Sequence, residues 1–160
     1  MIASLKGTVQ TKRPEGIIID VNGIGYQVSI PISRLGDIPE PGGSVFLHTY
    51  MHVREDNIQL FGFASIEEKK IFTTLMGISG VGPKLGLAIL AGMPATRFAE
   101  AVSNEDVTLL STIPGLGKKT ASRLILELKG KLPSLDDADT GKTETSADYN
   151  DSVSALVNLG

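Results

Sequence analysis

The chain has 160 residues, of which 41% are hydrophobic and 21% charged, and a formal net charge of −3. It contains no cysteine, which excludes disulfides, thiolate metal sites and a cysteine nucleophile. No apolar run approaches the roughly 18 residues of a transmembrane helix. The start of the chain shows no secretion signal, so we expect a cytoplasmic protein with no membrane contact. Residues 64–132 are nevertheless basic, with nine Lys/Arg against six Asp/Glu, whereas residues 133–160 have one against six.

The N-terminal part, 1–63, predicts a small barrel. Short runs rich in Ile, Val, Tyr and Phe alternate with turn signals, of which Asn22-Gly23 is typical of a tight hairpin. Five or six short strands in so short a segment suit a closed barrel better than an open sheet, whose edges would need protection. The expected strands are Met1–Gly7, Gly16–Val21, Tyr26–Ile30, Ser44–Met51 and Ile58–Phe63.

From Ser65 onward the hydrophobic pattern changes to a helical period. Ser65 and Glu68 form a capping-box pattern ahead of a first helix. Ser103 and Asp106 are expected to open a short helix that ends near Ser111. The other expected helices cover 83–91, 95–102 and about 118–132.

The end of the chain differs from the rest. Residues 133–151 are polar, acidic and nearly free of large apolar side chains, which predicts a flexible linker. Residues 152–160 regain apolar positions at helical spacing. We expect them to begin a third, helical unit that this chain does not complete.

Two segments of the helical part match at a constant offset of 35 residues. Aligning LMGISGVGPKLGLAIL (75–90) with LSTIPGLGKKTASRLI (110–125) pairs Gly80 with Gly115 and Gly82 with Gly117. A helix, a Gly-apolar-Gly turn and a second helix therefore occur twice. Such a duplication suits a ligand that itself repeats.

Nucleotide-cofactor motifs do not fit these glycines. A dinucleotide fingerprint needs G-x-G-x-x-G after a strand, but Gly80, Gly82 and Gly86 have a different spacing and follow a helix. A P-loop is excluded because the only Gly-Lys-Thr begins at Gly141, and the first position of the motif would be Asp136. The turns are then either plain helix–helix connections or sites for another anion.

The lysines beside the turns favour an anion. Lys84, Lys118 and Lys119 lie in the first turns of their helices, where the helix dipole disfavours cations by about 0.3–1 kcal/mol each. Lys119 and Arg123 also place like charges at i,i+4. An anion on the free N–H groups of the turn would offset both costs. With few aromatic residues for stacking on bases, we expect contacts to backbone phosphates without sequence preference.

Paired units of this kind resemble tandem helix-hairpin-helix motifs, which bind nucleic-acid backbone. With the barrel and the segments MIASLKG, GVGPKL, PGLGKKTA and VREDNIQLFGF, residues 1 to about 132 resemble the RuvA family, bacterial proteins that bind four-way Holliday junctions. The resemblance implies an α+β, multidomain fold. Its expected parts are an OB-type β-barrel (1–63), an all-α domain with tandem helix-hairpin-helix motifs (64–132), a flexible acidic linker (133–151) and the start of a helical, motor-binding domain (152–160).

The resemblance also implies partners. In this family four copies form a platform for the junction, and the third domain binds the hexameric ATPase RuvB, which supplies ATP hydrolysis for branch migration in recombination and repair. An octamer of two tetramers and a RuvC-type resolvase are further implied partners. The subunit itself is expected to have no catalytic residues, cofactor or metal.

The family's DNA-contacting residues carry over by motif. In the first turn they are Gly80, Val81, Gly82 and Lys84, and in the second Gly115, Leu116, Gly117, Lys118, Lys119 and Arg123. Glu55 and Asp56, flanked by Arg54, would form an acidic pin that repels phosphates at the crossover and keeps the strands apart without cutting them. On the residues alone, two adjacent acidic residues in a turn are more often simply solvated.

Other chemistry finds little support in the sequence. His48 and His52 face alike in an expected strand, and no third metal ligand is evident. Asp20, Glu55 and Asp56 could form a nuclease cluster, but no general base accompanies them. Two alternatives stay open: a DNA-repair nuclease that holds DNA with the two turns, and a protein-interaction module with no nucleic-acid role.

Overall fold

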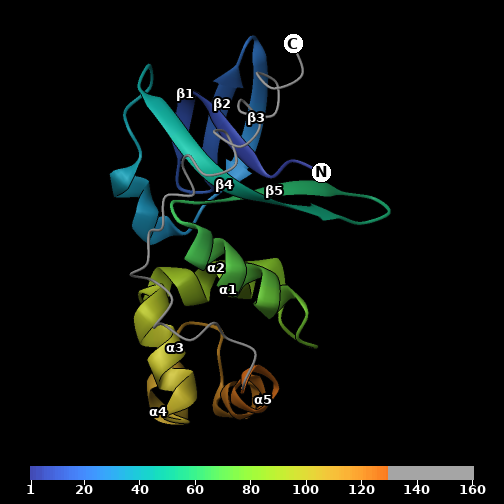
Figure 1. Cartoon of the computed structure of the whole chain (residues 1–160), viewed down its shortest axis with the longest axis vertical. Coiled ribbons are helices and arrows are strands. Elements are labelled where there is room, and N and C mark those ends of the chain that lie inside the picture. Colours follow the sequence, from blue (N-terminus) through green and yellow to red (C-terminus); the bar gives the residue numbers. More distant parts are fainter. Residues whose placement is uncertain (130–160) are drawn as a thin grey trace, which may run out of the picture.

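The computed structural model describes residues 1–129. The expected linker (133–151) and the expected start of a third domain (152–160) lie outside the described residues. In the described part, strands form the first half of the chain and helices the second. Figure 1 shows these two halves as two stacked layers, a barrel above and a group of helices below.

The strands form a closed five-stranded barrel, so the predicted barrel is confirmed. Their order is β1-β2-β3-β5-β4, and β4 pairs back onto β1. All pairs are antiparallel except β3 with β5. A 3-10 helix, η1, lies between β3 and β4, as expected of an OB-type barrel. The bounds are β1 Ser4–Arg13, β2 Gly16–Val21, β3 Ile24–Ser29, η1 Ile32–Asp37, β4 Ser44–Val53 and β5 Ile58–Phe63.

The first strand is longer than the sequence indicated, because Gly7 lies inside β1 instead of ending it. A Cβ on Gly7 would overlap the carbonyl oxygen of Asp20 on β2, so glycine is needed for this close approach. A register shift between Val9 and Thr11 interrupts the alternation that the prediction relied on. The expected tight turn at Asn22-Gly23 is confirmed, with φ of 53° and 88°.

Five helices follow the barrel in the described part of the chain. Ser65 caps α1 as predicted, its hydroxyl accepting from the N–H of Glu68 at 3.3 Å. The expectation for Ser103 was wrong: it is the last residue of α3, and the Asp106 side chain alone caps α4. The last helix ends at Leu128, earlier than expected. The bounds are α1 Ile66–Met76, α2 Pro83–Gly92, α3 Ala95–Ser103, α4 Val107–Leu110 and α5 Lys118–Leu128.

Phe72 on α1 joins the barrel to the helices. Its side chain is fully buried, and its ring lies 4.9 Å from Phe63, 5.1 Å from Phe61 and 5.5 Å from Tyr50, measured between centroids. These three partners come from β5 and β4, so the β4–β5 hairpin packs directly on α1. Figure 1 shows this hairpin extending sideways at the boundary between the two layers.

No single helix in residues 1–129 has the length and apolar character needed to cross a membrane. Taken together, α2 and α3 reach that length and composition, but the pair is bent by 98°.

Candidate nucleic-acid interface

The two Gly-apolar-Gly turns are one structure built twice. Four backbone hydrogen bonds of the first hairpin turn (78–82) and its flanks recur around the second (113–117), each at the sequence offset of the repeat. In the first copy they run, donor first, from Gly77 to Thr74, Ile78 to Leu75, Val81 to Ile78 and Gly86 to Gly82, with lengths of 3.0 or 3.1 Å. Their counterparts in the second copy have nearly the same lengths. The repeat seen in the sequence is therefore a repeat of backbone geometry.

The first glycine of each turn is required by its conformation. Gly80 has φ of +87° and Gly115 has φ of +85°, the left-handed region that side chains disfavour. The two values are nearly equal, so both turns reverse the chain in the same way.

Replacing Gly115 by alanine should therefore destabilise the protein by about 1–2 kcal/mol, the cost of the left-handed region for an L-residue. Urea unfolding measures the change. Gly36→Ala is the matched control, because Gly36 has no positive φ and a Cβ there would meet nothing within 4 Å. Equal stability of the two variants would contradict strain at Gly115.

The second glycine of each turn is not required by the fold. Gly82 and Gly117 have φ of −99° and −72°, which any residue adopts, and a Cβ on either would meet nothing within 4 Å. Within residues 1–129 the backbone N–H groups of Lys84, Lys119 and both glycines donate no hydrogen bond. Each turn thus leaves free donors beside a glycine that has no steric role inside the molecule.

The helix caps in the described part of the chain fall into two groups. Ser65 caps α1 and Asp106 caps α4 with side-chain oxygens, whereas α2, α3 and α5 have no side-chain cap and no acidic residue in the first turn; α2 and α5 follow a glycine, and α3 follows Pro94. At the start of α1, hydrogen bonds from the backbone N–H of Glu67 itself and from the side chain of Ser65 lower the pKa of Glu67. The two helices that follow the turns are left open to an external anion.

Cations surround the exposed donors. Lys84, Lys118 and Lys119 are exposed and, among the described residues, make no ion pair. Arg123 is also exposed but pairs with Glu127, one turn further along α5, at 2.8 Å. This attraction offsets the expected repulsion between Arg123 and Lys119. A solvent-exposed pair of this kind is weak, and Arg123 remains available to a phosphate.

The apolar residue in the middle of each turn points inward. Val81 and Leu116 are 7% and 2% exposed and belong to the helical core, so only their backbone atoms can meet a ligand. The two turns are also neighbours, since a Cβ on Gly115 would lie 3.7 Å from the side chain of Leu85 in the first turn of α2. Helix α2 therefore lies beside both turns: it directly follows the first and is close to Gly115 in the second.

The expected acidic pin lies at the tip of the protruding β4–β5 hairpin. Arg54 and Asn57 close the turn through a 2.8 Å backbone hydrogen bond, and Glu55 and Asp56 between them are exposed. Arg54 Nε donates to His52 Nε2 at 3.0 Å, so the guanidinium that flanks the two acidic residues in the sequence is held against β4.

Within the described residues, no group of three or more His, Asp or Glu side chains is arranged so that it could hold a metal ion. His48 and His52 lie instead beside aromatic rings, His48 against Phe46 at 5.1 Å and His52 against Tyr50 at 6.2 Å. Asp20 accepts from the N–H of Gly23 in the β2–β3 turn, a structural role.

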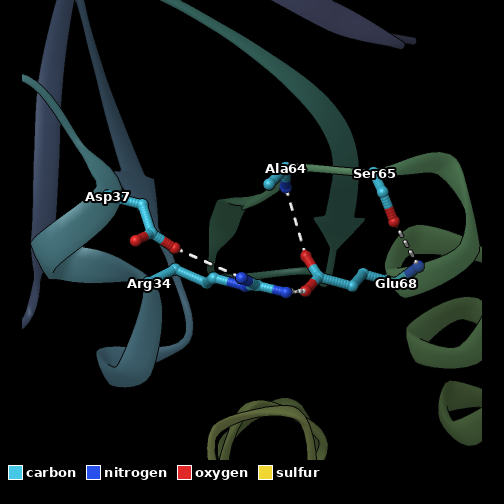
Figure 2. A network of polar contacts seen from close by, with 5 residues as sticks. All are labelled: Arg34, Asp37, Ala64, Ser65 and Glu68. Atoms are coloured by element: carbon cyan, nitrogen blue, oxygen red, sulfur yellow. Dashed lines mark hydrogen bonds and ion pairs between the residues drawn. The ribbon is translucent and has the colours of Figure 1, made fainter. Parts of the chain in front are cut away.

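An ion pair that the sequence did not predict connects the barrel to the helices (Figure 2). Arg34 of η1 donates through Nε and Nη2 to Glu68 of α1 at 2.8 and 2.5 Å, and its Nη1 pairs with Asp37. Its hydrogen bonds to Glu68 and Asp37 raise the pKa of Arg34. The second oxygen of Glu68 accepts from the N–H of Ala64, not of Ser65, so the capping box is only half formed.

Comparison with known proteins gives the same assignment for both halves. The model of the RuvA N-terminal domain matches residues 1–62, and that of the SAM-like helix-hairpin-helix tandem matches residues 72–131. Curated relatives named "Holliday junction branch migration complex subunit RuvA" match over the whole chain. That of Thioalkalivibrio sulfidiphilus is 46% identical with 84% of its length covered, and those of Geotalea daltonii and Geobacter sulfurreducens are 47% identical with 83% covered. The chain therefore belongs to the RuvA family.

Proposed function

We propose that this protein binds four-way (Holliday) junctions as the DNA-binding, non-catalytic subunit of a branch-migration complex, the role that the names of its relatives describe. The observation that carries the proposal is the duplicated turn: two copies of one backbone geometry, each with unbonded N–H groups and exposed lysines. No observation favours the nuclease alternative.

Each turn suits one phosphate of a DNA backbone. The N–H groups at the start of α2 and α5 supply directed donors, and the helix dipole adds positive potential at the same place. Gly82 and Gly117 let the phosphate approach the backbone, and Lys84, Lys118, Lys119 and Arg123 add charge. Because these groups read no base edges, the contact fixes position without selecting a sequence.

Selectivity for a junction would come from Glu55 and Asp56. Carboxylates that protrude on a narrow hairpin repel phosphates, and they would occupy the crossover point where the strands of a four-way junction separate. A continuous duplex offers no such opening, so the same carboxylates would oppose its close approach. The pin would guide strands rather than cut them.

The remaining partners are part of the proposal. Four copies would present eight turns and four acidic tips to the four arms of a junction, and a second tetramer could cover its other face. A RuvB-type ring ATPase would bind through the region that begins near residue 152, and a RuvC-type resolvase would act on the same junction. The complex would operate in the bacterial cytoplasm.

Electrophoretic titration of the protein with a four-way junction and with a duplex of equal length tests the proposal. We expect a clear preference for the junction at the same salt concentration. Equal binding would contradict junction selectivity, and the absence of salt-dependent binding to either DNA would favour the protein-interaction module.

Replacing Lys119 by alanine should weaken junction binding and reduce the slope of log K against log salt by about one unit per contacting subunit, because one phosphate contact is lost. The measurement is a set of titrations between 50 and 200 mM salt, over which a protein with about six to ten phosphate contacts loses about 10³–10⁵ in affinity. Lys6→Ala on β1 is the control, since it removes the same charge from the barrel. An unchanged slope would remove Lys119 from the contact surface.

A further inference from the structure

The ion pair between Arg34 and Glu68 (the interdomain pair) lies where the barrel and the helices meet. Glu68 is 3% exposed and is the only charged residue buried among residues 1–129. Both of its carboxylate oxygens are used, one by Arg34 from η1 and the other by the N–H of Ala64, which connects β5 to α1. Figure 2 shows the side chain of Glu68, on α1, extending toward Arg34 of η1.

Three elements meet at α1 and its neighbour α2. The β4–β5 hairpin, which bears Glu55 and Asp56, packs on Phe72 of α1. The helix that follows the first turn, α2, packs so closely on α1 that a Cβ on Gly86 would lie 2.9 Å from Phe72 and Met76. The barrel helix η1, which holds Arg34, contacts α2. The orientation of α1 against the barrel therefore sets where the turns lie relative to the acidic tip.

The apolar contacts at this boundary do not fix that orientation by themselves. Burial of Phe72 against Tyr50, Phe61 and Phe63 is favourable but non-directional, and small rotations keep most of the buried area. In contrast, Nε and Nη2 of the planar Arg34 guanidinium both donate to Oε1 of Glu68, and hydrogen bonds are directional. Arg34 is further held by Asp37 at 3.2 Å, so the pair adds a directional constraint to the apolar contacts at this boundary.

The energetics of such a pair point to orientation more than to stability. Glu68 is buried and bears the cost of leaving water, whereas the Arg34 side chain keeps 40% exposure, so water weakens its attraction for the carboxylate. Stability therefore does not explain a charged group at this place.

We propose that Arg34 and Glu68 are positioning residues: their ion pair fixes the angle between the acidic tip and the two hairpin turns, and the preference for a four-way junction over duplex depends on that angle. The inference rests on the proposed function for its DNA readout, but the angle itself is a property of the free protein. Duplex binding uses the turns and their lysines and is opposed by the acidic tip, so loss of the fixed angle should not weaken it.

The test is the double variant Arg34→Met/Glu68→Leu, which replaces the whole pair by apolar side chains and leaves no buried charge. We expect only a small loss of thermal stability, because the N–H of Ala64 loses its acceptor, and a duplex affinity no lower than that of the wild type. The junction-over-duplex preference should fall at least about fivefold, since two coupled sites lose their fixed geometry. Glu40→Gln is the matched control, because its pair with Lys12 joins β1 to the loop between η1 and β4 and includes no residue of α1–α5.

A second readout needs no DNA. The chain has no cysteine, so spin labels on cysteines introduced at exposed Gln59 (β5) and Glu100 (α3) report the distance between the layers without background. The proposal predicts a broader or shifted distance distribution in the double variant and the wild-type distribution in Glu40→Gln. An unchanged distribution, or a changed one with wild-type junction preference, would overturn it. A wild-type protein with no junction preference would instead overturn the proposed function, while the label distances still decide whether the pair sets the angle.

Discussion

Replacing Gly117 by aspartate is expected to leave the fold intact and to reduce junction affinity at least about tenfold, because each charge-assisted hydrogen bond from N–H to phosphate is worth about 1.5–3 kcal/mol. The φ of −72° and ψ of 161° at Gly117 are those of an ordinary N-cap. An aspartate there would accept from the free N–H groups of α5, as Asp106 accepts from Leu109 at 2.8 Å in α4. The same donors would then be occupied, and a negative charge would face the phosphate.

The stability of this variant should equal or slightly exceed that of the wild type, since aspartate and glycine differ by only a few tenths of a kcal/mol as N-caps. Thermal unfolding measures the stability, and titration with a four-way junction at fixed salt measures the affinity. Thr108→Asp adds the same charge on exposed α4 and is the matched control. If Gly117→Asp bound the junction like that control, the N–H groups of α5 would not hold a phosphate.

The site was predictable where its signal is local. A glycine that must adopt positive φ and a lysine in a first helical turn are both visible in short windows, and the constant offset of the repeat identified the second copy from the first. The tight turn at Asn22-Gly23 and the strands Gly16–Val21 and Ile58–Phe63 were predicted for the same reason. In each case the pattern and the structure involve the same few neighbouring residues.

The misses at Gly7 and Glu68 involve contacts between segments far apart in the chain. Gly7 looks like a strand end until the backbone of β2 lies against it. Arg34 and Glu68 are 34 residues apart, and nothing near either residue indicates its partner. Glu68 even carried a plausible local assignment, since its capping-box position is real, but its carboxylate is used by Arg34 and Ala64. The local pattern did not show which of these roles the Glu68 carboxylate takes, because the contact with Arg34 that decides it is tertiary.

Replacing Phe72 by alanine should cause a large loss of stability, about 3–5 kcal/mol, the usual cost of deleting a fully buried aromatic side chain. The ring is the centre of the contact between α1 and the β4–β5 hairpin, so its loss also separates the barrel from the helices. Urea unfolding followed by circular dichroism measures both effects. We expect the wild type to unfold in one transition and the variant to unfold earlier, with the two layers losing their structure at different urea concentrations.

Phe46→Ala is the matched control for that prediction, because it removes the same side chain from a position on β4 that is 50% exposed. Its cost should be about 1 kcal/mol or less, since half of the ring already contacts water and no helix depends on it. A similar loss in the two variants would contradict a special role for Phe72. A large loss confined to Phe72, with the layers unfolding separately, would mean that one ring couples the acidic tip to the helices that carry the two Gly-apolar-Gly turns.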